Sequence, residues 1–113
     1  MKIEVYYEYM PERSNPEDFQ FFYKYIVKFT NNTDDRLKIK SRVFKINNNG
    51  KKYEVSGNGV LGEEPWINPY SIYEYVSFMP LHTPTGNMRG YYTFCDDYGN
   101  ISTAEFPLTF FKR

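Results

Sequence analysis

The sequence predicts an all-β protein, built as an antiparallel β-sandwich or barrel. Aromatic residues make up 20% of the 113 residues, and the 12 Tyr and 10 Phe fall in short runs. Such residues fit a pleated, half-buried surface. The runs recur about every 8–12 residues between Gly, Pro and Asn, as is typical of antiparallel sheets. No segment repeats apolar residues at helical intervals over three turns, so we expect little or no helix.

The first two strands follow from alternation of polarity. Residues 3–7 predict the first strand, and the prolines within residues 10–18 predict a loop after it. Residues 19–30 predict a long second strand, and the Asn and Asp cluster at residues 31–35 predicts the turn that ends it. One face of this second strand carries four large apolar residues, Tyr23, Tyr25, Val27 and Phe29.

A predicted hairpin comes next. Residues 37–46 form its first strand, and the apolar phase changes between Val43 and Phe44. This change predicts a bulge there, or a strand buried on both faces. Residues 47–50 end in Asn-Gly, which tolerates the positive φ angles of a type I′ turn, and residues 52–55 return as a short strand.

The second half of the chain predicts three more strands, for about seven in all. Residues 57–69 are rich in Gly and Pro and predict a long connection before a strand at residues 72–78. Residues 80–87 contain two Pro and one Gly and predict a loop. Residues 88–96 alternate again and predict a strand, and residues 101–110 close the domain. One face of the sixth strand carries Met88, Gly90, Tyr92 and Phe94.

Composition excludes several classes of protein. The 14 Lys and Arg balance the 14 Asp and Glu, so we expect no nucleic-acid partner. One Cys and one His exclude an internal disulfide, a Cys-rich zinc site and a multi-His metal site, and we expect no cofactor. No apolar run approaches the ~20 residues that span a bilayer, and the N-terminus lacks a signal-peptide core. We therefore expect a single cytoplasmic domain over residues 1–113, without a membrane partner.

The residues that could carry catalysis give no recognisable pattern. His82 lies in a Pro-rich loop, where an exposed side chain is the ordinary outcome. Cys95 lies on a predicted strand, where a lone Cys usually behaves as a small apolar residue. The acidic pair at residues 63–64 and the pair at residues 96–97 offer oxygen ligands for Mg²⁺ or Co²⁺, but spacing alone does not bring them together. We expect no enzyme activity and assign no metal site.

The most conspicuous motif is a run of glycines that fits G-x-G-x-x-G, at Gly57, Gly59 and Gly62. In a dinucleotide-binding fold these glycines precede a helix, but here Glu63, Glu64 and a proline follow them. Two readings remain open. Successive glycine amides can form an anion-binding nest. Glycines in a β protein also mark positive φ angles, bulges and close crossings of the chain.

These residues resemble the signature of the ApaG family. The resemblance extends from about Val5 to Phe110 and rests on two long blocks in the family's order. The first block is Gly57-x-Gly59-Val60-x-Gly62-Glu63-x-Pro65. The second is Tyr75-x-Ser77-x-x-Pro80-Leu81-x-Thr83-Pro84-x-Gly86-x-Met88-x-Gly90-x-Tyr92. The pairs Ser41-Arg42 and Asn49-Gly50, with Asp96 and Gly99, also match.

The resemblance implies an immunoglobulin-like or fibronectin type III-like antiparallel β-sandwich. It also implies a protein-interaction module, and in bacterial members an association with cobalt and magnesium resistance. The sequence departs from the family in two places. Val43-Phe44 stands where many members have His-Trp, and Pro69-Tyr70 where many have Pro-Gly, which weakens the turn there.

The leading functional hypothesis is therefore a non-enzymatic module that binds an unidentified protein. Its predicted working surface combines the loop at residues 57–65 with residues 80–90, and exposed tyrosines could anchor the partner. The predicted binding residues are Gly57, Gly59, Gly62, Glu63, Arg42 and Arg89. The glycines would shape the backbone, Glu63 would accept hydrogen bonds or contact a divalent cation, and the two arginines would engage an anion.

Two other classes of function are kept as alternatives. One is a sensor that binds a phosphate compound, or its magnesium complex, through the loop at residues 57–62. The other, the least favoured, is a hydrolase of such a compound. Exposed edge strands also make a homodimer conceivable, because they can pair with a second copy.

Overall fold

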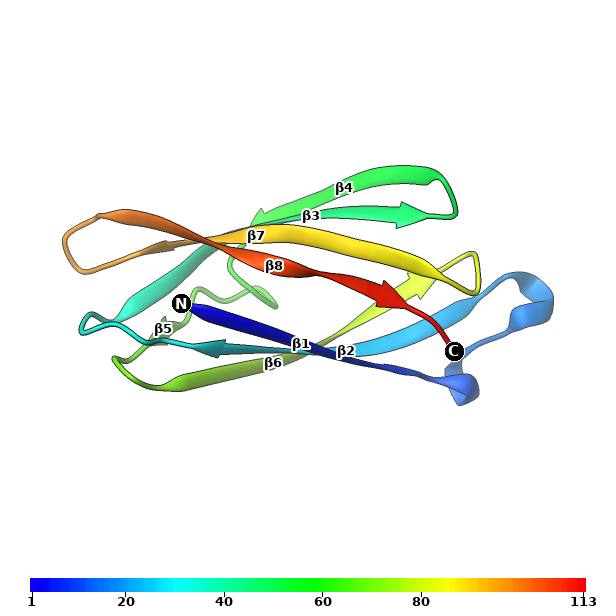
Figure 1. The fold of residues 1–113 in the computed structure, drawn as a ribbon, viewed down its shortest axis with the longest axis horizontal. Coiled ribbons are helices and arrows are strands. Elements are labelled where there is room, and N and C mark those ends of the chain that lie inside the picture. The colour runs from blue at the N-terminus through cyan, green and yellow to red at the C-terminus, as the bar shows by residue number, and fades with distance from the viewer.

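The computed structural model describes all residues from Met1 to Arg113. It is all-β, apart from two single-turn 3₁₀ helices, η1 and η2, in the predicted loop after the first strand (Figure 1). Each of these turns begins with a proline, Pro11 or Pro16. The strands are β1 (Lys2–Tyr9), β2 (Phe21–Thr30), β3 (Leu37–Asn48), β4 (Lys51–Asn58), β5 (Trp66–Ile67), β6 (Ile72–Leu81), β7 (Gly86–Cys95) and β8 (Ile101–Phe111).

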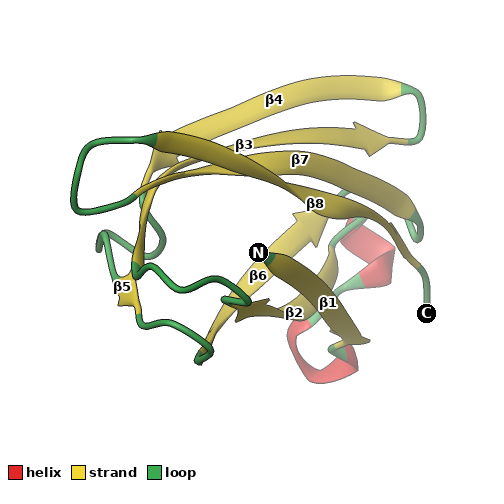
Figure 2. Ribbon diagram, turned by 60° about the vertical axis from the view of Figure 1, so that its left-hand side comes forward, coloured by secondary structure: helices red, strands yellow, loops and turns green.

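Two antiparallel sheets pack face to face, as predicted. The smaller sheet has the order β1-β2-β6, and the larger has the order β4-β3-β7-β8, with β5 paired to the beginning of β3. The larger sheet arches over the smaller one, with β4 at its outer edge (Figure 2). β1 packs against β8 and closes one side of the sandwich, whereas β4 and β6 stay apart and leave the other side open.

The core lies between the sheets and is largely aromatic. Every second residue of β2 is buried, beginning at Phe21, so the predicted inward face of this strand is confirmed. β7 contributes Met88, Tyr92 and Phe94, which are also fully buried as predicted. Many of the aromatic rings meet edge to face, as Phe29 and Tyr92 do with centroids 4.8 Å apart. This geometry adds to the stabilisation that comes from burial alone.

The bulge in β3 exists, but the predicted position is wrong. Its register with β7 shifts between Ile39 and Ser41, and not between Val43 and Phe44. The extra residue is Lys40. Before it the inward side chains are at odd-numbered positions, such as Ile39, and after it they are at even-numbered positions, such as Phe44. The sequence pattern shows only that four residues, an even number, lie between the apolar positions Ile39 and Phe44, so it does not locate the bulge among them.

The remaining differences concern the ends of strands. Asn49 and Gly50 both have positive φ angles, of 54° and 85°, so the predicted type I′ turn is confirmed. β5 was not predicted, because two residues are too few to show a pattern. β4 continues through Gly57, and β6 and β7 take up most of residues 80–90, leaving a loop at residues 82–85. The two family blocks are therefore partly strand, where loops were predicted.

Tyr70, where the family resemblance implies Gly, adopts a left-handed conformation with φ of 55°. Its hydroxyl donates a hydrogen bond of 2.6 Å to Asp34 Oδ1 at the surface. We expect Tyr70→Gly to raise the free energy of unfolding by about 0.5–1 kcal/mol, because glycine accepts this conformation without steric cost. Urea denaturation measures the change. Tyr70→Phe, which loses only the hydroxyl contact, is the control, and a Tyr70→Gly variant no more stable than it would contradict the explanation.

Candidate functional site

Arg42 on β3 holds the glycine segment in place. Its Nη1 donates hydrogen bonds to the carbonyl oxygens of Asn58, at 3.1 Å, and Gly59, at 2.8 Å. The guanidinium lies flat against Gly57, where an added Cβ would come within 2.9 Å of Nη2. Glycine at position 57 thus makes room for the arginine, which binds backbone carbonyls with one of its nitrogens.

The rest of the segment folds into a tight turn. Val60 and Glu63 exchange backbone hydrogen bonds of 2.8 and 2.9 Å around Leu61 and Gly62. Leu61 and Gly62 have positive φ angles of 50° and 77°, as a type I′ turn requires. Val60 is only 1% exposed and belongs to the core. The turn therefore anchors the segment in the core through Val60.

Gly59 joins this turn to the bulge in β3. Its N–H donates to the carbonyl oxygen of Lys40, the bulge residue, at 2.8 Å. Its φ angle is +57°, and a Cβ there would lie 1.8 Å from the carbonyl oxygen of Glu63. Lys40 also forms a 2.6 Å ion pair with Glu64, which lowers the pKa of that carboxyl through the hydrogen bond it receives.

These contacts leave the phosphate-binding alternatives without support from geometry. The amides of Gly59, Val60 and Glu63 all donate to carbonyl oxygens within the protein, so they do not converge on an external anion. Arg42 Nη1 is likewise engaged with backbone carbonyls, so only its Nε and Nη2 are left to contact another group. The glycines instead have the structural roles that the sequence left open: room for a side chain and a positive φ angle.

The two predicted arginines do not meet. Arg42 pairs with Tyr92 of β7 and faces the interior of the sandwich, whereas Arg89 pairs with Lys45 on the outer face of the same sheet. Arg89 borders a shallow depression together with Lys45 and Lys52. A single anion therefore cannot contact both arginines.

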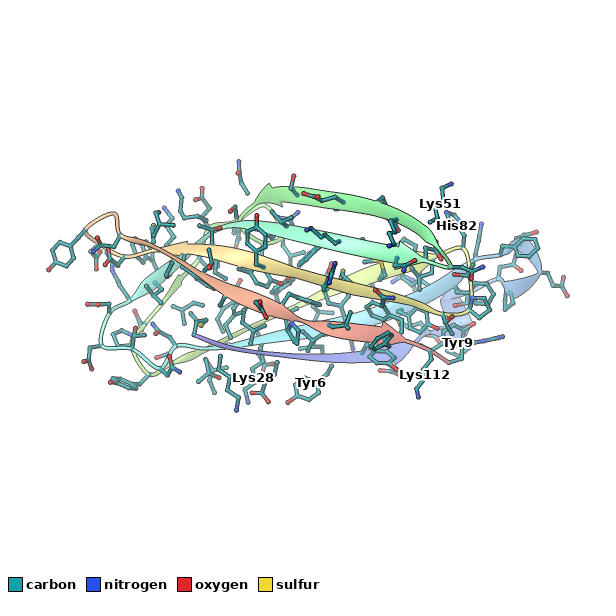
Figure 3. The ribbon with its side chains drawn as sticks, turned by 45° about the horizontal axis from the view of Figure 1, so that its top comes forward. Tyr6, Tyr9, Lys28, Lys51, His82 and Lys112 are labelled. Atoms are coloured by element: carbon teal, nitrogen blue, oxygen red, sulfur yellow. The ribbon has the colours of Figure 1, made fainter.

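The glycine segment and the loop of the second block lie apart. Asn58 of the glycine segment pairs with Ser41, whereas Asn87 of the second block pairs with Asn47, six positions further along β3 and about 20 Å away. Only the end of the second block comes near, because Tyr92 pairs with Arg42, which pairs with Gly57 on its other side. The loop after β6 approaches the β3–β4 turn, where Thr83 Oγ1 donates to Asn48 Oδ1. Figure 3 shows His82 and Lys51 at this end of the molecule. The predicted combined surface is not formed.

A groove instead occupies the open side of the sandwich, between β4 and β6. Its volume is about 310 Å³, and Arg42 is the only charged residue in its lining. The other lining residues are Tyr25, Phe44, Ile46, Tyr53, Val55, Ser77, Phe78, Met79 and Pro80. Tyr53 and Val55 on the inner face of β4 are each 41% exposed, because no strand of the smaller sheet lies opposite them.

Arg42 gives this groove a free cationic group. Nε and Nη2 form no hydrogen bond with the protein, and no side-chain nitrogen of the chain is both buried and unpaired. These two nitrogens therefore reach solvent. Burial raises the pKa of the nearby Tyr25, while the hydrogen bond with Ser77 and the charge of Arg42 oppose that rise. The groove can thus offer two guanidinium nitrogens and apolar walls to a ligand.

The acidic residues form no cluster. Glu64 is paired with Lys40, and Asp97 accepts a bidentate hydrogen bond from Arg36, which lowers the pKa of Asp97. Asp96 accepts hydrogen bonds from the amides of Tyr98 and Asn100 in the turn before β8. No group of three or more His, Cys, Asp or Glu side chains could hold a metal ion. Glu63 forms no ion pair, and the adjacent Glu64 is engaged with Lys40.

The exposed aromatic residues are dispersed and do not form one patch. Tyr6 lies on the outer face of the smaller sheet (Figure 3), whereas Tyr91 lies on the outer face of the larger one. Trp66 is covered by Arg36, whose guanidinium carbon lies 4.0 Å from the ring centroid. Among the exposed tyrosines, only Tyr53 faces the groove. Tyr53 and Val55 were not among the residues predicted to bind a partner.

The chain matches a known protein family over most of its length. The family model described as "ApaG domain" matches residues 11–96. This chain belongs to the ApaG family. It is 37% identical over 109 residues to Protein ApaG of Beijerinckia indica, covering 96% of this chain and 84% of that protein. It is 36% identical over 113 residues to Protein ApaG of Shewanella pealeana, covering 99% and 88% of the two chains.

Solved structures of relatives have the same fold. The ApaG chain superposes on the Bordetella pertussis protein described as ApaA with a TM-score of 0.93 and 31% identity, covering 98% and 91% of the two chains. It superposes on a second structure, a structural-genomics target, with a TM-score of 0.91 and 34% identity, covering 99% and 86%. The predicted sandwich is therefore also the fold of solved relatives. The structure contains no helix long and apolar enough to cross a membrane.

Proposed function

We propose that this ApaG chain is a non-enzymatic module that binds a protein partner through the open side of its sandwich. The observation that carries the proposal is the groove between β4 and β6, where apolar side chains and strand edges are exposed together. Unpaired strand edges and half-exposed apolar residues are features that proteins use to bind other proteins.

The placement of the reactive side chains supports a non-enzymatic role. His82 follows β6 at one end of the molecule, and Cys95 ends the ten-residue strand β7 at the other end. Ser77 faces the groove, beside Arg42 and Tyr25, and has no histidine near it. In this proposal, any contribution of the chain to cobalt or magnesium resistance would be made by the partner protein.

The groove can be tested by photo-crosslinking in cells. We expect p-benzoylphenylalanine in place of Tyr53 to form a covalent adduct with another protein on illumination. Tyr91 provides a matched control, because it is also 41% exposed but lies on the opposite face of the same sheet. An adduct at position 53 that is absent at position 91 is the expected result. No adduct at position 53, or equal adducts at both positions, would contradict the proposal.

A further inference from the structure

The smaller sheet is one long strand narrower than the larger sheet. Four long strands, β4, β3, β7 and β8, face only three, β1, β2 and β6. β1 lies against β8, so β4 is the strand of the larger sheet that has no strand of the smaller sheet opposite it. All residues of β4 except Gly57 are exposed, including those whose side chains point inward. A strand placed beside β6 would lie under β4 and cover this face.

We infer that the groove takes up an extended segment of the partner protein, which adds to the edge of β6 and directs a carboxylate to Arg42. This inference rests on the proposed function and names the chemistry of the partner. It depends on three features: a free backbone edge, an unpartnered cation and an apolar inner face of β4.

The edge of β6 is free and regular. Asn31 N donates to Ser71 O, next to the pair formed by Thr30 and Ile72. Because hydrogen-bonded pairs alternate along antiparallel strands, the odd-numbered residues of β6 bond to β2. The N–H and C=O groups of Glu74, Val76 and Phe78 therefore point away from β2. No other strand pairs with β6 along this edge.

Charge complementarity determines what the segment must carry. Arg42 is the only charged residue of the groove, and its Nε and Nη2 make no hydrogen bond within the protein. Two nitrogens on one edge of the planar guanidinium match the two oxygens of a carboxylate. An apolar occupant would cover this charge and leave it unpaired, which is unfavourable. An acidic residue in the segment avoids that cost.

The inward positions of β4 determine the rest of the pattern. Gly57, Val55 and Tyr53 pair with Arg42, Phe44 and Ile46, so the groove presents one charged and two apolar positions in succession. Side chains on one face of a strand recur every two residues. The segment should therefore carry apolar residues two and four positions away from its acidic residue.

The test is a selection from a phage library of random nonapeptides on the immobilised full chain. We expect the enriched peptides to share one Asp or Glu with apolar residues at the second and fourth positions from it. A synthetic peptide of the enriched sequence should bind at least about tenfold more tightly than its Gln or Asn counterpart, since it forms a charge-assisted hydrogen bond.

Variants of the chain locate the binding. Arg42→Gln and Val76→Pro should each weaken peptide binding at least about tenfold, the second because it removes an N–H of the free edge. Arg89→Gln and Val76→Thr are the controls and should bind as the unaltered chain does. Val76→Pro leaves the Arg42 contacts with the loop intact, so it tests the site even if Arg42→Gln unfolds the protein, which thermal melting shows.

The outcomes separate this inference from the proposed function. If no acidic pattern is enriched, or if the selected peptides bind the Val76→Pro variant unchanged, the inference is wrong. The proposed function still stands in that case if Tyr53 crosslinks to a protein. A dimer in solution that Val76→Pro dissociates would replace the partner segment with a second copy of this chain, and would also overturn the inference.

Discussion

Gly59→Ala is expected to destabilise the protein by about 3–4 kcal/mol. A left-handed φ angle costs a residue with a Cβ roughly 1–2 kcal/mol. The new Cβ would also stand 1.8 Å from the carbonyl oxygen of Glu63, so the turn has to open. An open turn withdraws Val60 from the core, and the loss of such a buried side chain costs about 1.5–3 kcal/mol. Urea denaturation of the variant measures the total.

Gly62→Ala is the matched control for this prediction. Gly62 also has a positive φ angle, of 77°, but an added Cβ would have no neighbour within 4 Å. We therefore expect Gly62→Ala to cost only about 1–2 kcal/mol, the conformational part alone. Equal losses in the two variants would show that the close approach of Gly59 to Glu63 contributes nothing.

The second large effect is a loss of stability at alkaline pH, caused by two buried tyrosines. The hydroxyls of Tyr75 and Tyr92 share a hydrogen bond of 2.5 Å in the core. Burial is the main reason that the pKa of each lies well above the ordinary value of 10.0 in the folded protein. The unfolded chain therefore releases these protons first as the pH rises.

The sign of the effect follows from this difference. Well below pH 10 both tyrosines are protonated in both states, and the free energy of unfolding does not change through them. Above pH 10 the unfolded state binds fewer protons than the folded state, so stability falls as pH rises. Each tyrosine removes about 1.4 kcal/mol by pH 11, and the pair removes about 3 kcal/mol. Denaturant unfolding between pH 8 and pH 11 measures this loss.

The double variant Tyr75→Phe, Tyr92→Phe removes both titrating groups. Because both partners of the hydrogen bond are lost together, we expect its stability at pH 7 to be close to that of the unaltered chain. Tyr92→Phe alone should cost about 1–3 kcal/mol at pH 7, since it leaves the Tyr75 hydroxyl buried without this partner. A double variant that loses as much stability by pH 11 as the unaltered chain would refute the assignment.

Local patterns in the sequence were sufficient for the seven long strands and for the turn between β3 and β4. The alternation of Tyr23, Tyr25, Val27 and Phe29 predicted the inward face of β2, because side chains of a strand alternate between its faces whatever its neighbours are. The Asn49-Gly50 pair predicted a type I′ turn, because few residues tolerate two successive positive φ angles. The position of the bulge was missed, because it depends on the pairing of β3 with β7.

The candidate site was predicted only in part. Arg42 was identified through the family resemblance and lies at the groove. Arg89, the second arginine that was predicted to engage an anion, lies on the other face of the sheet. Tyr53 and Val55 were not identified, because the same alternation of residues would be found in an edge strand whose inner face is covered by the opposite sheet. Their exposure results from the unequal number of strands in the two sheets.

The sequence by itself determined the all-β class, the approximate strands and the ApaG family, because these depend on residue type, local spacing and two long motifs. Only the tertiary structure decided which strand edges stay unpaired, which way Arg42 points and how the glycines are used. These properties depend on pairings between distant segments, such as β3 with β7 and β2 with β6. A bulge of one residue at Lys40 is enough to turn Arg42 inward, and no local pattern fixes where that residue is inserted.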